Sequence, residues 1–494
     1  MKKRVIIIGG GVSGLAAGVY AQKCGFDATI LESHSIPGGN CTSWKRKGYL
    51  FEGGMHWLGG SKKGSDLNKL WRHTGALNDD VKIHYGEPYV EIRYEGTPIQ
   101  LYRDVDRTEK EFLALSPADQ KEIKAFCNYI RKMKGLSMPT TDIKGVKVTK
   151  KVHPPLSMLF AAIRATGVLR RFSSISREEY AKRFSHPGIQ ELIRALPGGQ
   201  QGIAMLFLTM GTLATGEGGF PDGGSLPFAA RMAQTFQTLG GKLLFNTRAE
   251  RVVTENGKAV AVIANGNRLE TDAVIVANDT MQMDHLFDVP LHAPWLEQMR
   301  KTAEPTTCTL VSLGVNADLA AYPERLLTNF DPPIVIADQR YEYAIVNNYA
   351  NDQNYSPRGK TALTLQLTGD TYAFWKTAKE SGHYKDEKAK LEAAVIRALE
   401  KQMPEIRDNV EVCDIATPLT YERYCGNWKG SWMTAFTSVL STKPYPPTID
   451  GLNGVYFSGQ RMMPPGGLPP ALLTARIAVQ HLCRDTDTLF VSEA

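Results

Sequence analysis

Three glycines near the start of the chain have the spacing of a nucleotide-binding turn. Gly9, Gly11 and Gly14 stand in the order Gly-x-Gly-x-x-Gly. They directly follow the apolar run at residues 5–8, and Ser13 lies among them. In this pattern the first glycine permits a tight turn, the second lets the backbone approach a pyrophosphate, and the third lets the next helix lie close to the sheet. Phosphates then meet the free N–H groups and the positive dipole of the helix N-terminus, so a dinucleotide site is predicted.

An acidic residue completes this pattern. Glu32 closes the next apolar run, residues 28–31, and lies 18 residues after Gly14. A carboxylate at this place accepts hydrogen bonds from the diol of a ribose and disfavours a ribose 2′-phosphate. The chemistry therefore requires a strand at 5–8, a helix after the glycines and a second strand that leads to Glu32.

Length and composition describe a folded protein of two domains. The 494 residues exceed one ordinary core, while 43% hydrophobic and 22% charged residues are usual for a globular chain. No apolar stretch approaches the roughly 18 residues of a membrane span, and the first residues lack the pattern of a signal peptide. The seven cysteines are scattered and never in CxxC spacing, so we expect a cytoplasmic protein with no disulfide framework and no metal site.

Positive charge is concentrated in one segment. The net charge is +7, and residues 131–177 hold eleven basic residues against a single acid. Within this segment Leu156, Leu159, Phe160 and Ile163 share one helical face. An apolar face flanked by cations is typical of a helix that lies on an anionic membrane surface, with an amphipathic core helix as the alternative. We expect peripheral contact with the inner face of the membrane and no nucleic-acid binding, because no nucleic-acid motif accompanies the charge.

The signals for the nucleotide-binding domain come in three separated pieces. The middle piece has an Asn-Gly hairpin turn at 256–257 and a near-continuous apolar strand at 272–278. The last piece has a buried strand at 454–459 and a turn rich in proline and glycine before an apolar helix at 471–482. We expect an α/β fold with a discontinuous Rossmann-like domain and an inserted α+β substrate domain. The expected ranges are 1–70, 220–285 and 450–494 for the first, and 71–219 and 286–449 for the second.

Further motifs along the whole chain resemble those of a known family. They occur at residues 37–40, 48–59, 220–224, 417–424, 459–460 and 465–469. The chain is similar to the amine-oxidase-like FAD-dependent oxidoreductases of glutathione-reductase-like fold. More narrowly, it resembles the branch that holds the phytoene desaturases, carotenoid isomerases and retinol saturase. The resemblance implies FAD in an extended conformation and flavin chemistry on a long apolar polyene or isoprenoid lipid.

The resemblance also implies which residues hold the cofactor. Two positions depart from the family pattern: Asn40 stands where an arginine is frequent, and Gln460 stands where an acid is common, which is closer to retinol saturase. A helix N-terminus after the last turn would stabilise negative charge on a reduced flavin. The residues so implied are Gly9, Gly11, Ser13, Gly14 and Glu32 at the ADP half, Gly38, Gly39 and Asn40 near the pyrophosphate, Ala249 at the adenine, and His56, Gly459, Gln460, Gly467 and Leu468 at the ribityl–flavin end.

Three residues are candidates for moving a proton. His56 lies in the segment that the family places beside the flavin, where it could orient the ring or relay a proton near neutral pH. A structural histidine is the alternative. Tyr421 or Tyr424 could donate a proton if a double bond is saturated. Hydride transfer between carbon and flavin N5 needs no protein nucleophile or metal.

These features lead us to expect an FAD-dependent oxidoreductase whose substrate domain encloses an apolar tunnel. The reaction is desaturation, saturation or cis–trans isomerisation of a carotenoid- or retinoid-like lipid, and the electron partner stays open. One alternative is an amine-oxidase-type enzyme on a soluble amine, which would need an aromatic cage and an acid that the sequence does not locate. The other is a non-catalytic prenyl-lipid carrier of the same fold, against which the intact FAD motifs argue.

Overall fold

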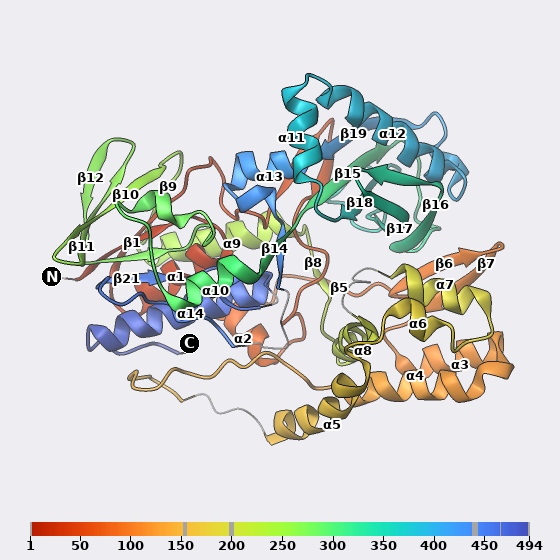
Figure 1. Cartoon of the computed structure of the whole chain (residues 1–494), viewed down its shortest axis with the longest axis horizontal. Helices are drawn as coiled ribbons and strands as arrows, with labels where there is room; N and C mark the ends of the chain where they lie inside the picture. Colours follow the sequence, from red (N-terminus) through yellow and green to blue (C-terminus); the bar gives the residue numbers. More distant parts are fainter. Residues whose placement is uncertain (1, 152–155, 197–201, 437–442, 465, 493–494) are drawn as a thin grey trace.

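The computed structural model describes residues 2–151, 156–196, 202–436, 443–464 and 466–492. Two large sheets and a group of helices organise this part of the chain (Figure 1). A five-stranded sheet lies on the side of the N-terminus, and a seven-stranded sheet lies at the opposite end, above a layer of helices.

The five-stranded sheet is parallel and has the order β21-β13-β1-β2-β9. Val5 and Ile7 of β1 point to one face, because side chains alternate along a strand, and they join a core with residues of α1, α9 and α14. The strands come from all three predicted pieces, so the discontinuous Rossmann-like sheet is confirmed. The elements are β1 (Arg4–Ile8), β2 (Asp27–Leu31), β9 (Lys242–Leu244), β13 (Ala273–Val276), β21 (Val455–Phe457), α1 (Val12–Lys23), α9 (Ser225–Thr238) and α14 (Leu468–Asp485).

The opposite face of this sheet is covered by a small antiparallel sheet and one helix. Ile6 and Ile8 pack in a core with residues of β10 (Ala249–Glu255), β11 (Lys258–Ala264) and α10 (Pro294–Thr302). Asn256 and Gly257 join β10 to β11 with φ angles of 51° and 73°. Positive φ at both turn residues is the geometry of a tight hairpin, which confirms the predicted turn. The third strand is β12 (Asn267–Glu270).

The seven-stranded sheet is mixed and has the order β19-β15-β18-β17-β16-β6-β7. One face of it packs on α11 (Tyr372–Glu380) and α12 (Tyr384–Glu400) around Trp375 and Val395. The strands are β6 (Val90–Tyr94), β7 (Thr97–Leu101), β15 (Cys308–Val315), β16 (Arg325–Ile336), β17 (Gln339–Asn348), β18 (Thr361–Thr368) and β19 (Val410–Ala416).

A helical layer forms a separate core beneath β6 and β7 (Figure 1). Phe126, Phe172, Tyr180 and Phe207 meet at its centre. Its helices are α3 (Val105–Leu115), α4 (Gln120–Met133), α5 (Leu156–Phe172), α6 (Arg177–Ala181), α7 (Pro187–Ala195) and α8 (Gly202–Leu213).

Short ribbons and helices connect the two sheets. The ribbons pair β3 with β4, β5 with β8, and β14 with β20. Their bounds, with two short helices, are β3 (Ser43–Arg46), β4 (Tyr49–Glu52), β5 (Ile83–His84), β8 (Phe220–Pro221), β14 (Ala303–Thr306), β20 (Met433–Phe436), α2 (Asp66–His73) and α13 (Pro418–Cys425).

The domain boundaries stay a prediction, and two segments expected in the substrate domain pack on the Rossmann-like part. One is α10, which covers the parallel sheet. The other surrounds Asp142, whose carboxylate accepts hydrogen bonds from Arg476 at 2.5 Å and Gln480 at 2.6 Å on α14. Both segments therefore pack on the nucleotide-binding domain, although the sequence places them outside its three predicted pieces.

Candidate active site

In the glycine turn, the fold itself requires glycine at positions 9 and 14 but not at position 11. Gly9 has a φ of +104°, and a side chain at Gly14 would place its Cβ 1.8 Å from the Gly9 carbonyl oxygen. At Gly11 an added Cβ would meet nothing closer than the Gly38 carbonyl oxygen, at 3.8 Å. The open space at Gly11, at the N-terminus of α1, fits the predicted approach of a pyrophosphate.

Glu32 is held rigidly at the carboxyl end of β2. Its two carboxylate oxygens accept hydrogen bonds from the Gly10 N–H at 2.6 Å and the His34 N–H at 2.7 Å. An ionised carboxylate has about four acceptor sites, so these bonds leave capacity for ribose hydroxyls. Ala249, the predicted adenine contact, is the buried first residue of β10.

The second glycine pair lies directly on the first turn. The Gly38 N–H donates to the Gly10 carbonyl at 2.9 Å, and a bridge pairs Gly38 with Gly11. Asn40 continues this segment away from the glycines. Its amide donates to the Trp432 carbonyl at 3.4 Å, and its side-chain oxygen accepts from Asn427 at 2.7 Å. Asn40 therefore contacts the segment that directly precedes β20.

The C-terminal turn presents a second open surface at the start of α14. Gln460 closes this turn, because its side-chain oxygen accepts from the Gly467 N–H at 3.1 Å and its amide donates to the Trp432 carbonyl at 3.1 Å. An added Cβ at Gly467 would meet no atom within 4 Å. Leu468 begins α14, so the N-terminus of that helix faces the opening.

These two surfaces fit an extended dinucleotide. Open backbone lies at Gly11 and at Gly467, each at a helix N-terminus, and Glu32 lies at the outer end. The buried polar atoms without a hydrogen-bond partner in the described residues include Nδ1 of His56 and Oδ1 of Asn278. Each has a free position for a hydrogen bond to a bound group. The roles of the individual residues toward FAD stay predictions.

His56 lies between elements that are far apart in the sequence. Its Nε2 contacts the Gln366 amide of β18, its carbonyl accepts from Arg325 of β16, and its ring meets the edge of Trp432 at 5.3 Å. Burial, together with the positive charge of Arg325, lowers the pKa of His56 to about 3. Burial thus favours the neutral imidazole. Whether His56 orients the flavin, relays a proton or is a structural histidine stays a prediction.

The two candidate tyrosines of α13 have different surroundings. The Tyr421 hydroxyl is buried and donates to the Gly53 carbonyl at 3.1 Å, so it lies against the segment that carries His56. Burial raises the pKa of Tyr421 well above its usual value, which keeps its proton in place. Tyr424 is exposed, and its ring meets His34 at 5.4 Å, two residues after Glu32. The structure thus places Tyr421, and not Tyr424, against Gly53 in the segment that leads to His56.

A polar pocket opens beside His56. Two guanidinium groups lie over the ring of Tyr89, Arg325 at 4.9 Å and Arg103 at 5.5 Å. Charged and amide residues at the ends of β16 and β17 contribute polar groups to this pocket. The expected apolar tunnel stays a prediction. Residues that line the pocket include His56, Tyr89, Arg103, Arg325, Asn347 and Tyr349.

Sequence reasoning missed two buried acids that hold the site together. Asp279 follows β13 and binds Arg461, which follows β21, through two hydrogen bonds of 2.8 and 2.7 Å. Glu52 is fully buried and accepts from the N–H groups of Gly54 at 2.8 Å and Ser225 at 2.9 Å. Burial raises the pKa of Glu52. A charged residue just after a buried apolar strand is the signal that could have identified Asp279.

Comparison with known proteins agrees with this geometry. The profile of the flavin-containing amine oxidoreductase family matches residues 12–483, so the chain belongs to that family, which implies a flavin cofactor. The fold is similar to that of a putrescine oxidase variant, with a TM-score of 0.63, 16% identity and coverage of 98% of this chain and 99% of that chain.

Three curated relatives carry the names of enzymes that act on carotenoids or on retinol. A lycopene-forming phytoene desaturase of Paracoccus sp. is 26% identical over 56% of this chain and 55% of its own. The chain thus spans about half the length of that relative. All-trans-retinol 13,14-reductase of Danio rerio is 23% identical over 86% of this chain and 76% of its own. Prolycopene isomerase 2 of an Oncidium hybrid cultivar is 22% identical over 97% and 84%, respectively.

Proposed function

We propose that this chain is an FAD-dependent oxidoreductase that acts on a long polyene or isoprenoid lipid of carotenoid or retinoid type. The observation that carries the proposal is the pairing of two open backbone surfaces, at Gly11 and at Gly467, across one parallel sheet. Each surface lies at a helix N-terminus, where phosphate and a reduced flavin ring are favoured. The polyene relatives support the substrate class.

The polar pocket narrows the class of substrate that we expect. Arg103 and Arg325 line the pocket and already donate to backbone carbonyls, those of Gly218 and His56 among them. A plain hydrocarbon end would shield their remaining N–H groups from water without replacing the hydrogen bonds to water, which is unfavourable. A polyene that ends in a hydroxyl or carbonyl oxygen can accept hydrogen bonds there. We therefore expect polar-ended polyenes to be better substrates than plain hydrocarbons.

Bound FAD supplies hydride exchange between a substrate carbon and flavin N5. The chain's own residues hold the reacting groups and control protons. Burial and Arg325 keep the pKa of His56 low, so its imidazole would add no positive charge to a flavin held near it. The Tyr421 hydroxyl retains its proton and donates a hydrogen bond to Gly53. Saturation of a double bond requires a proton donor in addition to the hydride, and Tyr421 is the buried donor that lies against the His56 segment.

Product masses test this proposal. Purified full-length protein is loaded with FAD and incubated without oxygen, in oxidised and in reduced form, with carotenoids, retinoids, unsaturated fatty acids and soluble amines. Loss of two hydrogens indicates desaturation, gain of two indicates saturation, and an unchanged mass with altered geometry indicates isomerisation. Turnover of amines alone would refute the lipid proposal and support the amine-oxidase alternative.

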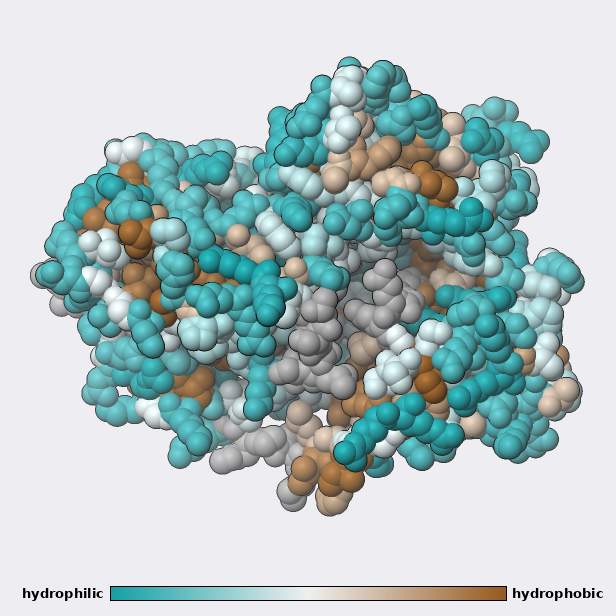
Figure 2. All heavy atoms as spheres, in the orientation of Figure 1, coloured by the Kyte–Doolittle hydropathy of each residue, from teal (hydrophilic) through white to brown (hydrophobic). Residues whose placement is uncertain are grey.

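We further propose that α5 touches a membrane surface from which such a lipid enters. Ala161, Ala165, Val168 and Phe172 bury one face of α5. The other face exposes Leu159, Phe160 and Ile163 to 58%, 62% and 63%. Figure 2 shows a brown cluster at the lower edge of the molecule, where Figure 1 has α5. The side chain of Leu156, the fourth residue of the predicted face, lies outside the described residues.

The charges around α5 favour an anionic surface. Arg164, Arg170 and Arg171 are exposed on this helix. Within the described ranges, no helix is both long and apolar enough to cross a bilayer. Contact would therefore be interfacial, with the exposed apolar side chains entering the headgroup region.

Vesicle flotation tests the membrane proposal. Burial of a large apolar side chain is worth about 1.5–3 kcal/mol, so a Phe160→Glu/Ile163→Glu variant should bind anionic vesicles at least about 100-fold more weakly. Val335, on β16, is 59% exposed and provides the matched control. Val335→Glu should leave vesicle binding unchanged. Equal binding by all three proteins would refute the role of α5.

A further inference from the structure

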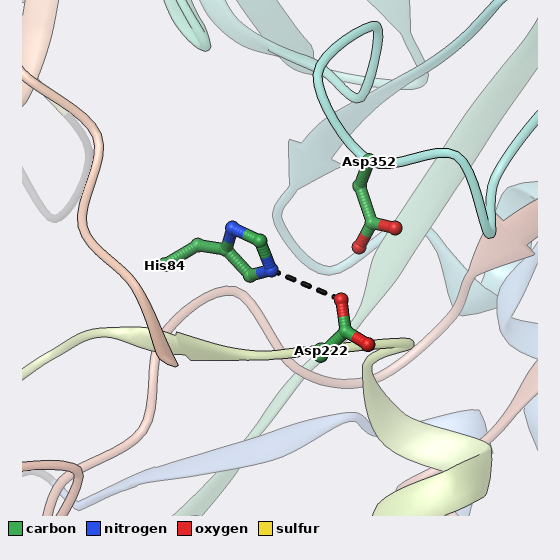
Figure 3. A group of neighbouring side chains, drawn as sticks. All are labelled: His84, Asp222 and Asp352. Carbon is green, nitrogen blue, oxygen red and sulfur yellow. Dashed lines mark hydrogen bonds and ion pairs between the residues drawn. The ribbon is translucent and has the colours of Figure 1, made fainter. Parts of the chain in front are cut away.

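Three potential metal ligands from distant parts of the sequence meet at the rim of the polar pocket. They are His84 of β5, Asp222 just after β8, and Asp352 in the loop after β17 (Figure 3). Nε2 of His84 lies 3.0 Å from Oδ1 of Asp222, and the three ligand atoms all lie within 4.8 Å of one another. Figure 3 shows the imidazole and the Asp222 carboxylate facing each other, with the Asp352 carboxylate directed toward the same place.

An unpaired buried oxygen also points to a missing ligand. Oδ2 of Asp352 is shielded from solvent and makes no hydrogen bond to any described residue. Asp352 is half-buried, and its other oxygen accepts from the Asn354 amide at 2.7 Å, so Oδ2 is the oxygen that still lacks a partner. Shielding an anionic oxygen from water without a partner is unfavourable. A cation beside the carboxylate would satisfy it.

Basic side chains contribute little direct pairing to the two carboxylates. Within the described ranges no lysine or arginine lies within ion-pair distance of Asp222 or Asp352, and His84 contacts Asp222. Burial lowers the pKa of the more distant Arg231, and the charge of Asp222 partly offsets this effect by raising it. The Asn354 amide bridges the two acids instead, at 3.3 Å from Asp222 and 2.7 Å from Asp352. A neutral amide balances neither charge.

We propose that His84, Asp222 and Asp352 form a binding site for a divalent transition-metal cation. One imidazole with two carboxylates suits Zn²⁺ or Mn²⁺ better than Ca²⁺ or Mg²⁺, which prefer oxygen ligands alone. Ligands about 2.1 Å from one ion lie about 3 Å apart when adjacent in an octahedron, which matches the His84–Asp222 separation. The Asp352 carboxylate moves slightly inward to complete the set.

The site connects the rim of the pocket to the segment of His56. Tyr355, three residues after Asp352, donates through its hydroxyl to Glu52 at 3.2 Å. Glu52 in turn accepts from the N–H groups of Gly54 and Met55. A cation would therefore fix the loop that buttresses the residues directly before His56. This consequence does not depend on the identity of the lipid substrate.

Metal titration of the purified full-length protein tests the site. The protein is treated with EDTA, dialysed and titrated with Mn²⁺, and the electron paramagnetic resonance signal of free Mn²⁺ is recorded. We expect one Mn²⁺ per chain, displaced by Zn²⁺. Replacement of a single ligand, as in Asp352→Asn or His84→Gln, should weaken binding by more than about tenfold, because even residues behind the ligands contribute that much.

A second histidine–aspartate pair provides the control. His383 and Asp386 lie 3.4 Å apart, are both exposed and have no third ligand among the described residues. His383→Gln should bind Mn²⁺ as the wild type does. The flavin content and the thermal unfolding midpoint in EDTA show whether each variant is folded. If one of the two ligand variants does not fold, the other one provides the test. The proposal would be overturned if the wild type bound no Mn²⁺ at millimolar concentration. It would also be overturned if both ligand variants bound Mn²⁺ as tightly as the wild type.

Discussion

Replacement of Gly11 by alanine separates a cofactor role from a structural one. An added Cβ at this position lies 3.8 Å from the Gly38 carbonyl oxygen and 3.9 Å from the Gly39 Cα, which are ordinary contacts. Gly11 is the N-cap of α1 and has a φ of −70°, which alanine adopts freely. The substitution should therefore reduce the stability of the cofactor-free protein by no more than about 1 kcal/mol, the usual effect of alanine at an N-cap.

The same methyl group occupies the space that we assign to the pyrophosphate. It displaces the phosphates from the N–H groups at the start of α1. Hydrogen bonds to charged groups contribute about 1.5–3 kcal/mol each. Loss of two such bonds therefore weakens FAD binding by about 3–6 kcal/mol, or roughly 100-fold to 10,000-fold.

Calorimetric titration of the cofactor-free protein with FAD, together with urea unfolding, measures both quantities. Two glycines serve as controls. Gly14→Ala should unfold the protein, because its Cβ would lie 1.8 Å from the Gly9 carbonyl oxygen. Gly167→Ala, in α5 with nothing within 4 Å, should change neither FAD binding nor folding by much. A Gly11→Ala protein that binds FAD as tightly as the wild type would refute the assignment of the pyrophosphate site, and one that fails to fold would refute the structural reasoning.

Two further predictions concern stability. Asp279→Asn should destabilise the protein by about 3–5 kcal/mol in urea unfolding, because it leaves the buried Arg461 guanidinium without a carboxylate partner. The exposed pair of Arg4 and Asp272 provides the comparison. Asp272→Asn should reduce the free energy of unfolding by less than about 1 kcal/mol. His73, which stacks on Tyr20, has its pKa lowered to about 3 by burial and then by nearby positive charge. Because the folded pKa is below the unfolded value of about 6.5, its stabilising effect is complete above pH 6.5 and declines as the pH falls toward 3, by about 2 kcal/mol between pH 7 and pH 5. His73→Phe should remove that part of the pH dependence, and an unchanged slope would contradict the pKa.

The sequence predicted the sheet and the glycine turn because both are local. The apolar runs that became β1, β2, β13 and β21 are each visible within a few residues, and so is the hairpin at 256–257. Patterns of this kind depend on side-chain alternation and on glycine conformations, which neighbours in the chain determine.

The remaining features depend on partners that are distant in the sequence. Asp279 and Arg461 are 182 positions apart, and nothing near either residue identifies the other. The pKa of His56 is lowered by burial and by the positive charge of Arg325, which comes from the seven-stranded sheet. The sequence around His56 shows neither effect, because both come from the folded structure.

The flavin content of the purified protein tests the central claim most directly. The chain is expressed in full, purified, reconstituted with FAD if necessary and freed of excess cofactor, and the flavin released on denaturation is measured per chain. We predict about one FAD per chain and the yellow absorption of oxidised flavin, bleached by reduction. A protein that is folded and yet retains no flavin would contradict the account and leave the lipid-carrier alternative.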